Sequence, residues 1–133
     1  MKKNKILLLD DNPIHMEVMV DGLEDFGYEV RKAQNVEAAE KILYDFTPDL
    51  FLVDIVIETI KSAGIQFAQT VRNKPEYRST PILFISAHLD DVNIIKYFPP
   101  DADENSLLKP YDILAKPFDF DQLMNKILEV LKD

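Results

Sequence analysis

The sequence contains no cysteine, which excludes disulfides, thiolate metal sites and cysteine nucleophiles. It also has no apolar run long enough to cross a membrane. Residues 1–5 are basic, but Asp10 interrupts the apolar residues that follow them, so the N-terminus does not match a secretory signal peptide. We therefore expect a soluble, cytoplasmic protein with no membrane insertion.

Basic charge is scarce as well. The chain has 15 Lys and Arg against 24 Asp and Glu, a net charge of −9. This charge repels phosphate backbones, and no basic stretch offsets it, so we expect no binding to nucleic acid. Such acidity favours divalent cations and basic protein surfaces. The length of 133 residues and the 47% hydrophobic content fit one folded domain, predicted over residues 1–133.

Four short apolar runs each end in a polar or charged side chain. The runs at 6–9, 50–53, 82–85 and 113–115 are followed by Asp10 and Asp11, by Asp54, by Ser86 and by Lys116, respectively. Short, continuously apolar runs are typical of strands buried on both faces, as in parallel sheets. Such sheets bind ligands at the carboxyl ends of their strands. The sequence therefore predicts that three carboxylates, a hydroxyl and an ammonium converge on one sheet edge.

Helical patterns separate these strands. The first helix is predicted to begin with Asn12 as its N-cap and Pro13 at its first position, and to end before Gly27. Its inner face would carry Met16, Met19, Val20, Leu23 and Phe26. A second strand is predicted at 28–32, the last strand at 112–115, and further helices at 36–46, 62–73, from about 91 and at 119–131. This alternation predicts an α/β, flavodoxin-like doubly wound (βα)5 domain with a parallel five-stranded sheet in the order 2-1-3-4-5.

The expected cluster of Asp10, Asp11 and Asp54 has a definite chemistry. Carboxylates a few ångströms apart repel one another and call for a cation. Mg²⁺ suits them best, because it prefers oxygen ligands and retains several waters. A carboxylate there can also act as a nucleophile and form an aspartyl phosphate. Lys116 and the cation would then neutralise the phosphoryl oxygens, and Ser86 would donate a hydrogen bond to one of them.

Four stretches in this order resemble the signature stretches of the receiver domain of bacterial two-component response regulators. They are Leu-Leu-Leu-Asp-Asp-Asn-Pro at 7–13, Leu-Val-Asp-Ile at 52–55, Ile-Ser-Ala at 85–87 and Ala-Lys-Pro-Phe at 115–118. The resemblance covers essentially the whole chain. It implies a phosphorylation-dependent signalling switch in a phosphorelay, in which Asp54 accepts a phosphoryl group from a sensor histidine kinase or a histidine phosphotransfer protein. The output would be an altered affinity for a downstream protein target.

The resemblance also implies the roles of the other site residues. Asp11, Asp54 and the backbone carbonyl of Val56 would bind Mg²⁺ directly, and Asp10 would act mainly through a water. In the same way, Ser86 would be the switch hydroxyl and Lys116 the ammonium that contacts the phosphate. The protein would not be an enzyme beyond self-phosphorylation and self-dephosphorylation. We expect a stand-alone receiver similar to the chemotaxis regulators, or a fragment of a larger regulator or hybrid kinase.

Another Lys-Pro pair, at Lys109, offers an alternative phosphate contact. Lys109 lies at about the family's usual spacing from Ser86, and Lys116 lies some seven residues further on. We choose Lys116, because an apolar strand precedes it and an amphipathic helix follows it. This choice implies an insertion at 99–110, between the fourth and fifth strands.

Two other functions remain open. The family's usual Met-Pro pair is absent after Asp54, and Gly64 comes about two residues later than usual, so the chain could be a receiver-like protein-interaction module that works without phosphorylation. A Mg²⁺-dependent phosphatase of the haloacid-dehalogenase type would also use an aspartyl phosphate. That class requires a second aspartate two residues after the nucleophile, where this chain has Val56.

Overall fold

The computed structural model of this chain describes residues 4–55, 63–86 and 110–131. The helix expected from about residue 91, the Val56 carbonyl and Lys109 lie outside these residues, as does the predicted insertion apart from Pro110. In the part of the chain that is described, no helix has both the length and the apolar character needed to cross a membrane.

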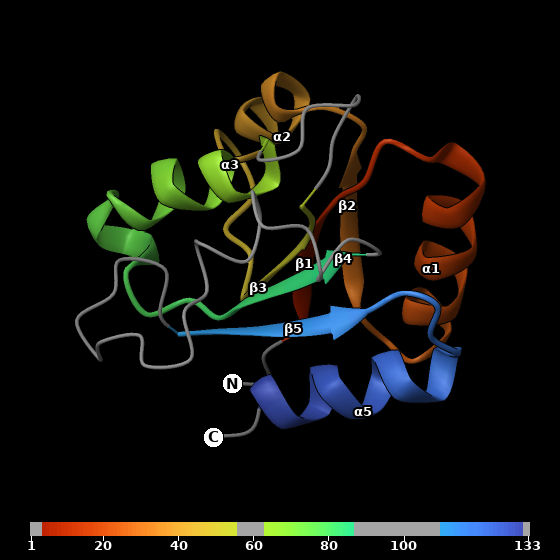
Figure 1. Cartoon of the computed structure of the whole chain (residues 1–133). Helices are drawn as coiled ribbons and strands as arrows, with labels where there is room; N and C mark the ends of the chain where they lie inside the picture. Colours follow the sequence, from red (N-terminus) through yellow and green to blue (C-terminus); the bar gives the residue numbers. More distant parts are fainter. Residues whose placement is uncertain (1–3, 56–62, 87–109, 132–133) are drawn as a thin grey trace.

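Five parallel strands form one sheet in the order β2-β1-β3-β4-β5 (Figure 1). The strands are β1 at Lys5–Leu9, β2 at Glu29–Ala33, β3 at Leu50–Asp54, β4 at Ile82–Ser86 and β5 at Tyr111–Ala115. This topology confirms the predicted flavodoxin-like order. It leaves β2 and β5 at the edges and places β1, β3 and β4 side by side in the middle.

Helices cover both faces of the sheet (Figure 1). The described helices are α1 at Pro13–Asp25, α2 at Val36–Ile42, α3 at Ala63–Arg72 and α5 at Phe120–Val130, with a short 3₁₀ turn at Pro75–Tyr77. α1 and α5 pack on one face, and α2 and α3 pack on the other. The sheet therefore contacts a layer of helices on each face.

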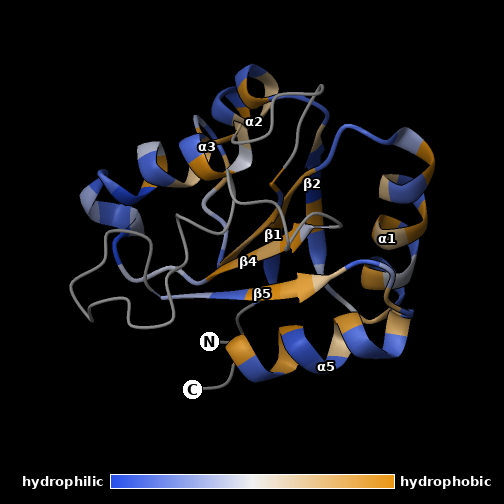
Figure 2. Ribbon diagram, in the orientation of Figure 1, coloured by the Kyte–Doolittle hydropathy of each residue, from blue (hydrophilic) through white to orange (hydrophobic). Residues whose placement is uncertain are grey.

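The middle strands supply side chains to both layers, which explains their continuously apolar sequences. Leu7 and Phe51 pack toward α2 and α3, whereas Leu8 and Leu52 pack toward α1 and α5. All four side chains are fully buried. In Figure 2, the middle strands are hydrophobic along their length, whereas the helices mix hydrophobic and hydrophilic residues. Strands whose side chains alternate between two equally buried faces are expected in a parallel sheet.

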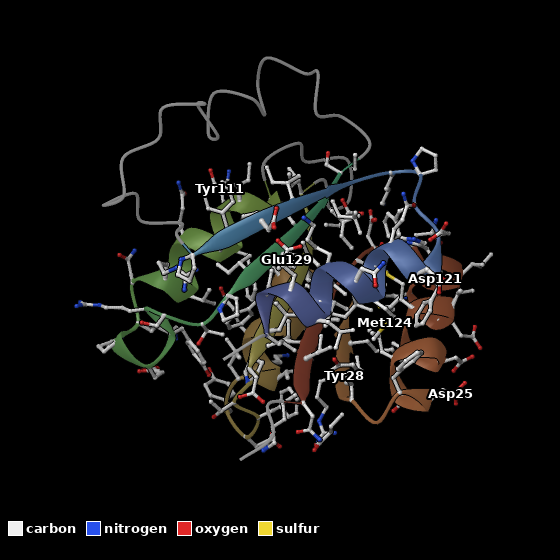
Figure 3. All side chains as sticks on the ribbon, turned by 90° about the horizontal axis from the view of Figure 1, so that it is seen from below. Asp25, Tyr28, Tyr111, Asp121, Met124 and Glu129 are labelled. Carbon is white, nitrogen blue, oxygen red and sulfur yellow. The ribbon has the colours of Figure 1, made fainter. Side chains whose placement is uncertain are left out.

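α5 completes the layer beside α1. Its N-cap Asp119 and Gln122 form a reciprocal capping box, which fixes where the helix begins. In Figure 3, seen from below, α5 lies in front of the strands with Met124 labelled on it. Met124 is only 4% exposed and belongs to the same core cluster as Leu123. The predicted amphipathic helix after Lys116 is thus present.

The start of α1 follows the predicted capping pattern. The Asn12 side chain accepts hydrogen bonds from the backbone N–H groups of Ile14 and His15, both at 3.1 Å. Pro13 occupies the first helical position, where it loses no hydrogen bond. Gly27 follows the helix with φ +96°, a backbone conformation that residues other than glycine rarely adopt. These residues fix where the helix begins relative to Asp10 and Asp11.

One prediction about the α1 core was wrong. Phe26 was expected on the buried face, but it is 62% exposed. The helix ends at Asp25, and Phe26 forms its C-cap with its N–H bonded to the Leu23 carbonyl. The ring therefore leaves the helical face and contacts Phe120 of α5, with 5.9 Å between the ring centroids.

The limits of α2 and β2 also differ from the sequence prediction, and those of β5 and α5 differ by one residue. α2 ends at Ile42 and not at residue 46. The N–H groups of residues 43–45 bond to carbonyls three residues earlier, at 3.2 to 3.3 Å, so the chain tightens into 3₁₀ geometry there. β2 begins at Glu29 because the Tyr28 N–H still bonds to the Leu23 carbonyl at the end of α1.

Candidate functional site

Three carboxylates meet at the carboxyl end of the sheet. Leu9 pairs with Val53 across β1 and β3, so the residues that follow them, Asp10 and Asp54, lie next to each other. One oxygen each of Asp10, Asp11 and Asp54 lies within 4.8 Å of the others. Asp10 is fully buried and Asp54 is 5% exposed. Carboxylates this close favour a cation, and a set of oxygen donors alone fits Mg²⁺.

Lys116 brings a positive charge to this cluster from β5. Its Nζ lies 2.7 Å from an Asp54 carboxylate oxygen, and its side chain is 26% exposed. β4 separates β3 from β5, so the lysine side chain extends across the end of β4. The Lys116–Pro117 peptide bond is cis. The sequence has three Lys-Pro pairs, at Lys74, Lys109 and Lys116. The pair at Lys116 directly follows a strand of the sheet, and its lysine contacts Asp54.

Ser86 lies between the two strands that carry Asp54 and Lys116. It is the last residue of β4, pairs with Ala115 of β5 and is 1% exposed. Its carbonyl accepts a hydrogen bond from the Lys116 N–H at 2.9 Å. On the other side of β4, the Ile55 N–H donates to the Ile85 carbonyl at 3.0 Å. Backbone hydrogen bonds thus tie the ends of these three strands together.

Gly64 packs directly against the backbone of Asp54. Its N–H bonds to the Ile55 carbonyl at 2.9 Å, which anchors the start of α3 at the end of β3. A Cβ at this position would lie 2.0 Å from the Asp54 carbonyl oxygen and 2.8 Å from the Ile55 Cα. Because the obstructing atoms are backbone, no side-chain movement would make room. Sequence reasoning noted where Gly64 falls, but not this close approach.

His15 is a site residue that sequence reasoning missed. Its Nδ1 lies 2.8 Å from one Asp10 carboxylate oxygen, and the other oxygen accepts a hydrogen bond from the Asn12 N–H at 2.9 Å. The sequence did hold a signal for this contact. Asn12 was predicted as the N-cap, which places His15 in the first turn of the helix directly after the acidic pair.

Comparison with known proteins identifies the family. The model of the response regulator receiver domain matches residues 6–128. The phosphate regulon transcriptional regulatory protein PhoB of Pseudomonas aeruginosa is 28% identical to this chain over 127 residues, which cover 96% of the chain and 51% of PhoB. The chain spans about half or less of the length of the first curated relatives that it matches.

Solved structures share the fold. The chemotaxis response regulator CheY4 of Vibrio cholerae superposes with a TM-score of 0.78 at 23% identity, covering 97% of this chain and 99% of CheY4. The receiver domain of the sensor histidine kinase PA1611 from Pseudomonas aeruginosa PAO1 has a TM-score of 0.76 at 23% identity, with 98% of each chain covered. That structure contains a magnesium ion coordinated in its active-site cleft. Members of the receiver domain family are phosphoacceptor switches and not classical enzymes. Because the family model covers nearly the whole length of this chain, the chain belongs to the receiver domain family of two-component response regulators.

Proposed function

We propose that residues 1–133 form one receiver domain in which Asp54 accepts a phosphoryl group from a phosphohistidine. The donor would be a sensor histidine kinase or a histidine phosphotransfer protein. The observation that carries this proposal is the 2.7 Å contact between Lys116 and Asp54 beside the other two carboxylates. It gives one nearly buried carboxylate a cationic neighbour on one side and an acidic, cation-binding cluster on the other.

The transfer step exchanges a P–N bond of the donor for an O–P bond on Asp54. An Asp54 carboxylate oxygen attacks the phosphorus, the new O–P bond forms as the P–N bond breaks, and the electron pair returns to the histidine nitrogen of the donor. Phosphoryl transfer depends mainly on positioning and on neutralising oxygen charge. Lys116 would move its hydrogen bond from the Asp54 carboxylate to a phosphoryl oxygen. Ser86 would donate its hydroxyl hydrogen to another, because it ends the strand next to β3.

The acidic residues would hold Mg²⁺. Asp11 and Asp54 would bind it directly, with the Val56 carbonyl, and Asp10 would act mainly through a water. A bound Mg²⁺ would neutralise negative charge on the phosphoryl oxygens. The support from this chain is its cluster of three carboxylates within 4.8 Å, and the magnesium-containing receiver domain of PA1611 has the same fold.

Phosphorylation would change binding to a downstream protein target. The added charge at the end of the sheet would bias the domain toward one of two existing arrangements. α1 offers the upstream partner an apolar surface close to the site, because Ile14 and Val18 are 75% and 62% exposed there. We propose that the phosphoryl donor contacts this helix.

Asp54→Asn tests the acceptor role. Beryllofluoride mimics a phosphoryl group on aspartate, so in the presence of Mg²⁺ it should shift the amide NMR signals around Ser86 and Lys116 in the unaltered protein. We expect no such shifts in Asp54→Asn, and the full response in Asp45→Asn, whose carboxyl is exposed and away from the cluster. A response that survives in Asp54→Asn would contradict the proposal. An unaltered protein with no response would favour an interaction module that works without phosphorylation.

Lys116→Met tests the phosphate contact. Removing one preorganised charge from a phosphoryl-transfer site is expected to slow phosphorylation by acetyl phosphate about 100- to 1000-fold. Binding of Mg²⁺ should persist, since the three carboxylates remain. The matched control is Lys126→Met, because Lys126 is equally exposed at 26% and pairs with a different aspartate, Asp112, at 3.1 Å. Equal phosphorylation rates in the two variants would exclude Lys116 from the transfer step.

A further inference from the structure

We infer that His15 is a positioning residue for the acidic site: its ring holds the Asp10 carboxylate in one orientation and links it to the segment that carries Lys116. The inference rests on the proposed function, because it concerns the same Mg²⁺ site. It adds a residue from α1 to a site otherwise built at the ends of the strands.

The Asp10 carboxylate is held on both sides. Both of its oxygens already have a protein partner, one at His15 Nδ1 at 2.8 Å and the other at the Asn12 N–H at 2.9 Å. Each carboxylate oxygen can accept a second hydrogen bond, so both keep a lone pair for a cation or its water. Two fixed oxygens stop the carboxylate from rotating, which lowers the entropy lost when a cation binds.

His15 itself is held at its backbone and at its ring. Its backbone N–H bonds to the Asn12 side chain in the first turn of α1, at 3.1 Å. Its ring meets the Phe118 ring edge-on, with 5.8 Å between centroids and 60° between planes. Backbone and ring are therefore both restrained, and the side chain is only 31% exposed. A restrained histidine can orient Asp10, whereas a freely rotating one could not.

Phe118 connects this contact to the other side of the site. It lies two residues after Lys116, which pairs with Asp54 at 2.7 Å. His15 thus contacts both Asp10 and Phe118, and the backbone of residues 116–118 links Phe118 to Lys116, which pairs with Asp54. The contact between His15 and Phe118 therefore joins the start of α1 to the segment that follows β5.

The nature of the hydrogen bond identifies a conservative replacement. A carboxylate oxygen accepts hydrogen bonds, so we assign the hydrogen of this contact to His15 Nδ1. An asparagine amide nitrogen is separated from Cβ by the same number of bonds as Nδ1 and also donates. Leucine has a similar bulk but no donor. His15→Asn should therefore keep the Asp10 contact, and His15→Leu should lose it.

The test measures the affinity of the full chain for Mg²⁺ alone, by titration followed in amide NMR spectra. Loss of a residue that orients a metal ligand typically weakens metal binding 10- to 100-fold, so we expect a dissociation constant about tenfold higher for His15→Leu. We expect His15→Asn to stay within about threefold of the unaltered protein. Glu24→Gln is the control on α1, because Glu24 is exposed and lies in the last turn of the helix, at the end opposite the acidic cluster. Melting temperatures without Mg²⁺ would establish that all variants are folded.

Two results would overturn the inference. Unchanged Mg²⁺ affinity in His15→Leu would mean that His15 does not position Asp10. Equal weakening in His15→Leu and His15→Asn would mean that the ring matters for packing and not for the hydrogen bond. Neither result depends on phosphorylation, so it is distinct from failure of the proposed function, which would appear as a beryllofluoride response that persists in Asp54→Asn.

Discussion

Gly64→Ala is expected to destabilise the domain by about 3 kcal/mol, the upper end of the usual range for overpacked sites. A Cβ at this position would lie 2.0 Å from the Asp54 carbonyl oxygen. That oxygen and the neighbouring Ile55 Cα belong to the backbone, so α3 and the end of β3 would have to move apart. The movement would also displace the Asp54 carboxylate. We therefore expect phosphorylation by acetyl phosphate to fall together with the free energy of unfolding.

Gly27→Ala is the matched control for this prediction. Gly27 has φ +96°, but a Cβ there would meet no atom within 4 Å. Its replacement should cost only the strain of a left-handed backbone, about 1–2 kcal/mol, and should leave the site unchanged. Urea unfolding would give the two free energies, and beryllofluoride binding would report on the site. Equal effects of the two substitutions on both measurements would mean that α3 does not press against the end of β3.

The contrast between these glycines illustrates what the sequence could predict. Gly27 was identified in advance, because a glycine after a capped amphipathic helix follows a local rule. The convergence of Asp10 and Asp54 at one sheet edge was also predictable, since it depends only on strand ends and on a parallel sheet. The close approach of Gly64 to the Asp54 backbone could not be predicted. It depends on the distance between α3 and the end of β3, and the sequence that connects them follows no regular pattern.

His15 and Phe26 show the same limit on side chains. Periodicity assigned Phe26 to the buried face, but the helix ends one residue earlier, and the ring turns outward. Periodicity gave His15 no role, although the cap at Asn12 already placed it near the acidic pair. Contacts within one turn follow from local rules. Contacts such as that between His15 and Phe118 join residues far apart in the chain and require the packed structure.

The second large effect is expected at Arg72, at the end of α3. Its side chain is buried, with 2% of the residue exposed, and burial lowers the pKa of its guanidinium to about 10, so it remains a cation at neutral pH. The guanidinium donates hydrogen bonds to three backbone carbonyls, those of Tyr77, Thr80 at 2.7 Å and Pro110 at 2.8 Å. It therefore joins α3 to the start of β4 and to the start of β5.

We expect Arg72→Met to destabilise the domain by about 3–5 kcal/mol. Methionine retains much of the apolar stem but has no donor, and the three carbonyls belong to the backbone and cannot be removed with it. Arg72→Lys should recover part of the loss, because a single ammonium keeps the charge but lacks the planar, five-donor geometry of the guanidinium. Arg31→Met is the control, since Arg31 is about half exposed and pairs with Glu29 at 3.5 Å. Its effect in urea unfolding should stay below about 1 kcal/mol.

The Arg72 contacts also bear on the position of Lys116. Pro110 directly precedes β5, and Lys116 directly follows it, so Arg72 anchors one end of the strand whose other end reaches Asp54. Amide hydrogen exchange in Arg72→Met should therefore accelerate more in β5 than in β1, which lies in the middle of the sheet and has paired strands on both sides. Uniform acceleration in all strands would mean that Arg72 supports overall stability alone. A selective effect on β5 would mean that a buried arginine at the opposite end of the sheet helps to hold the lysine in place at the site.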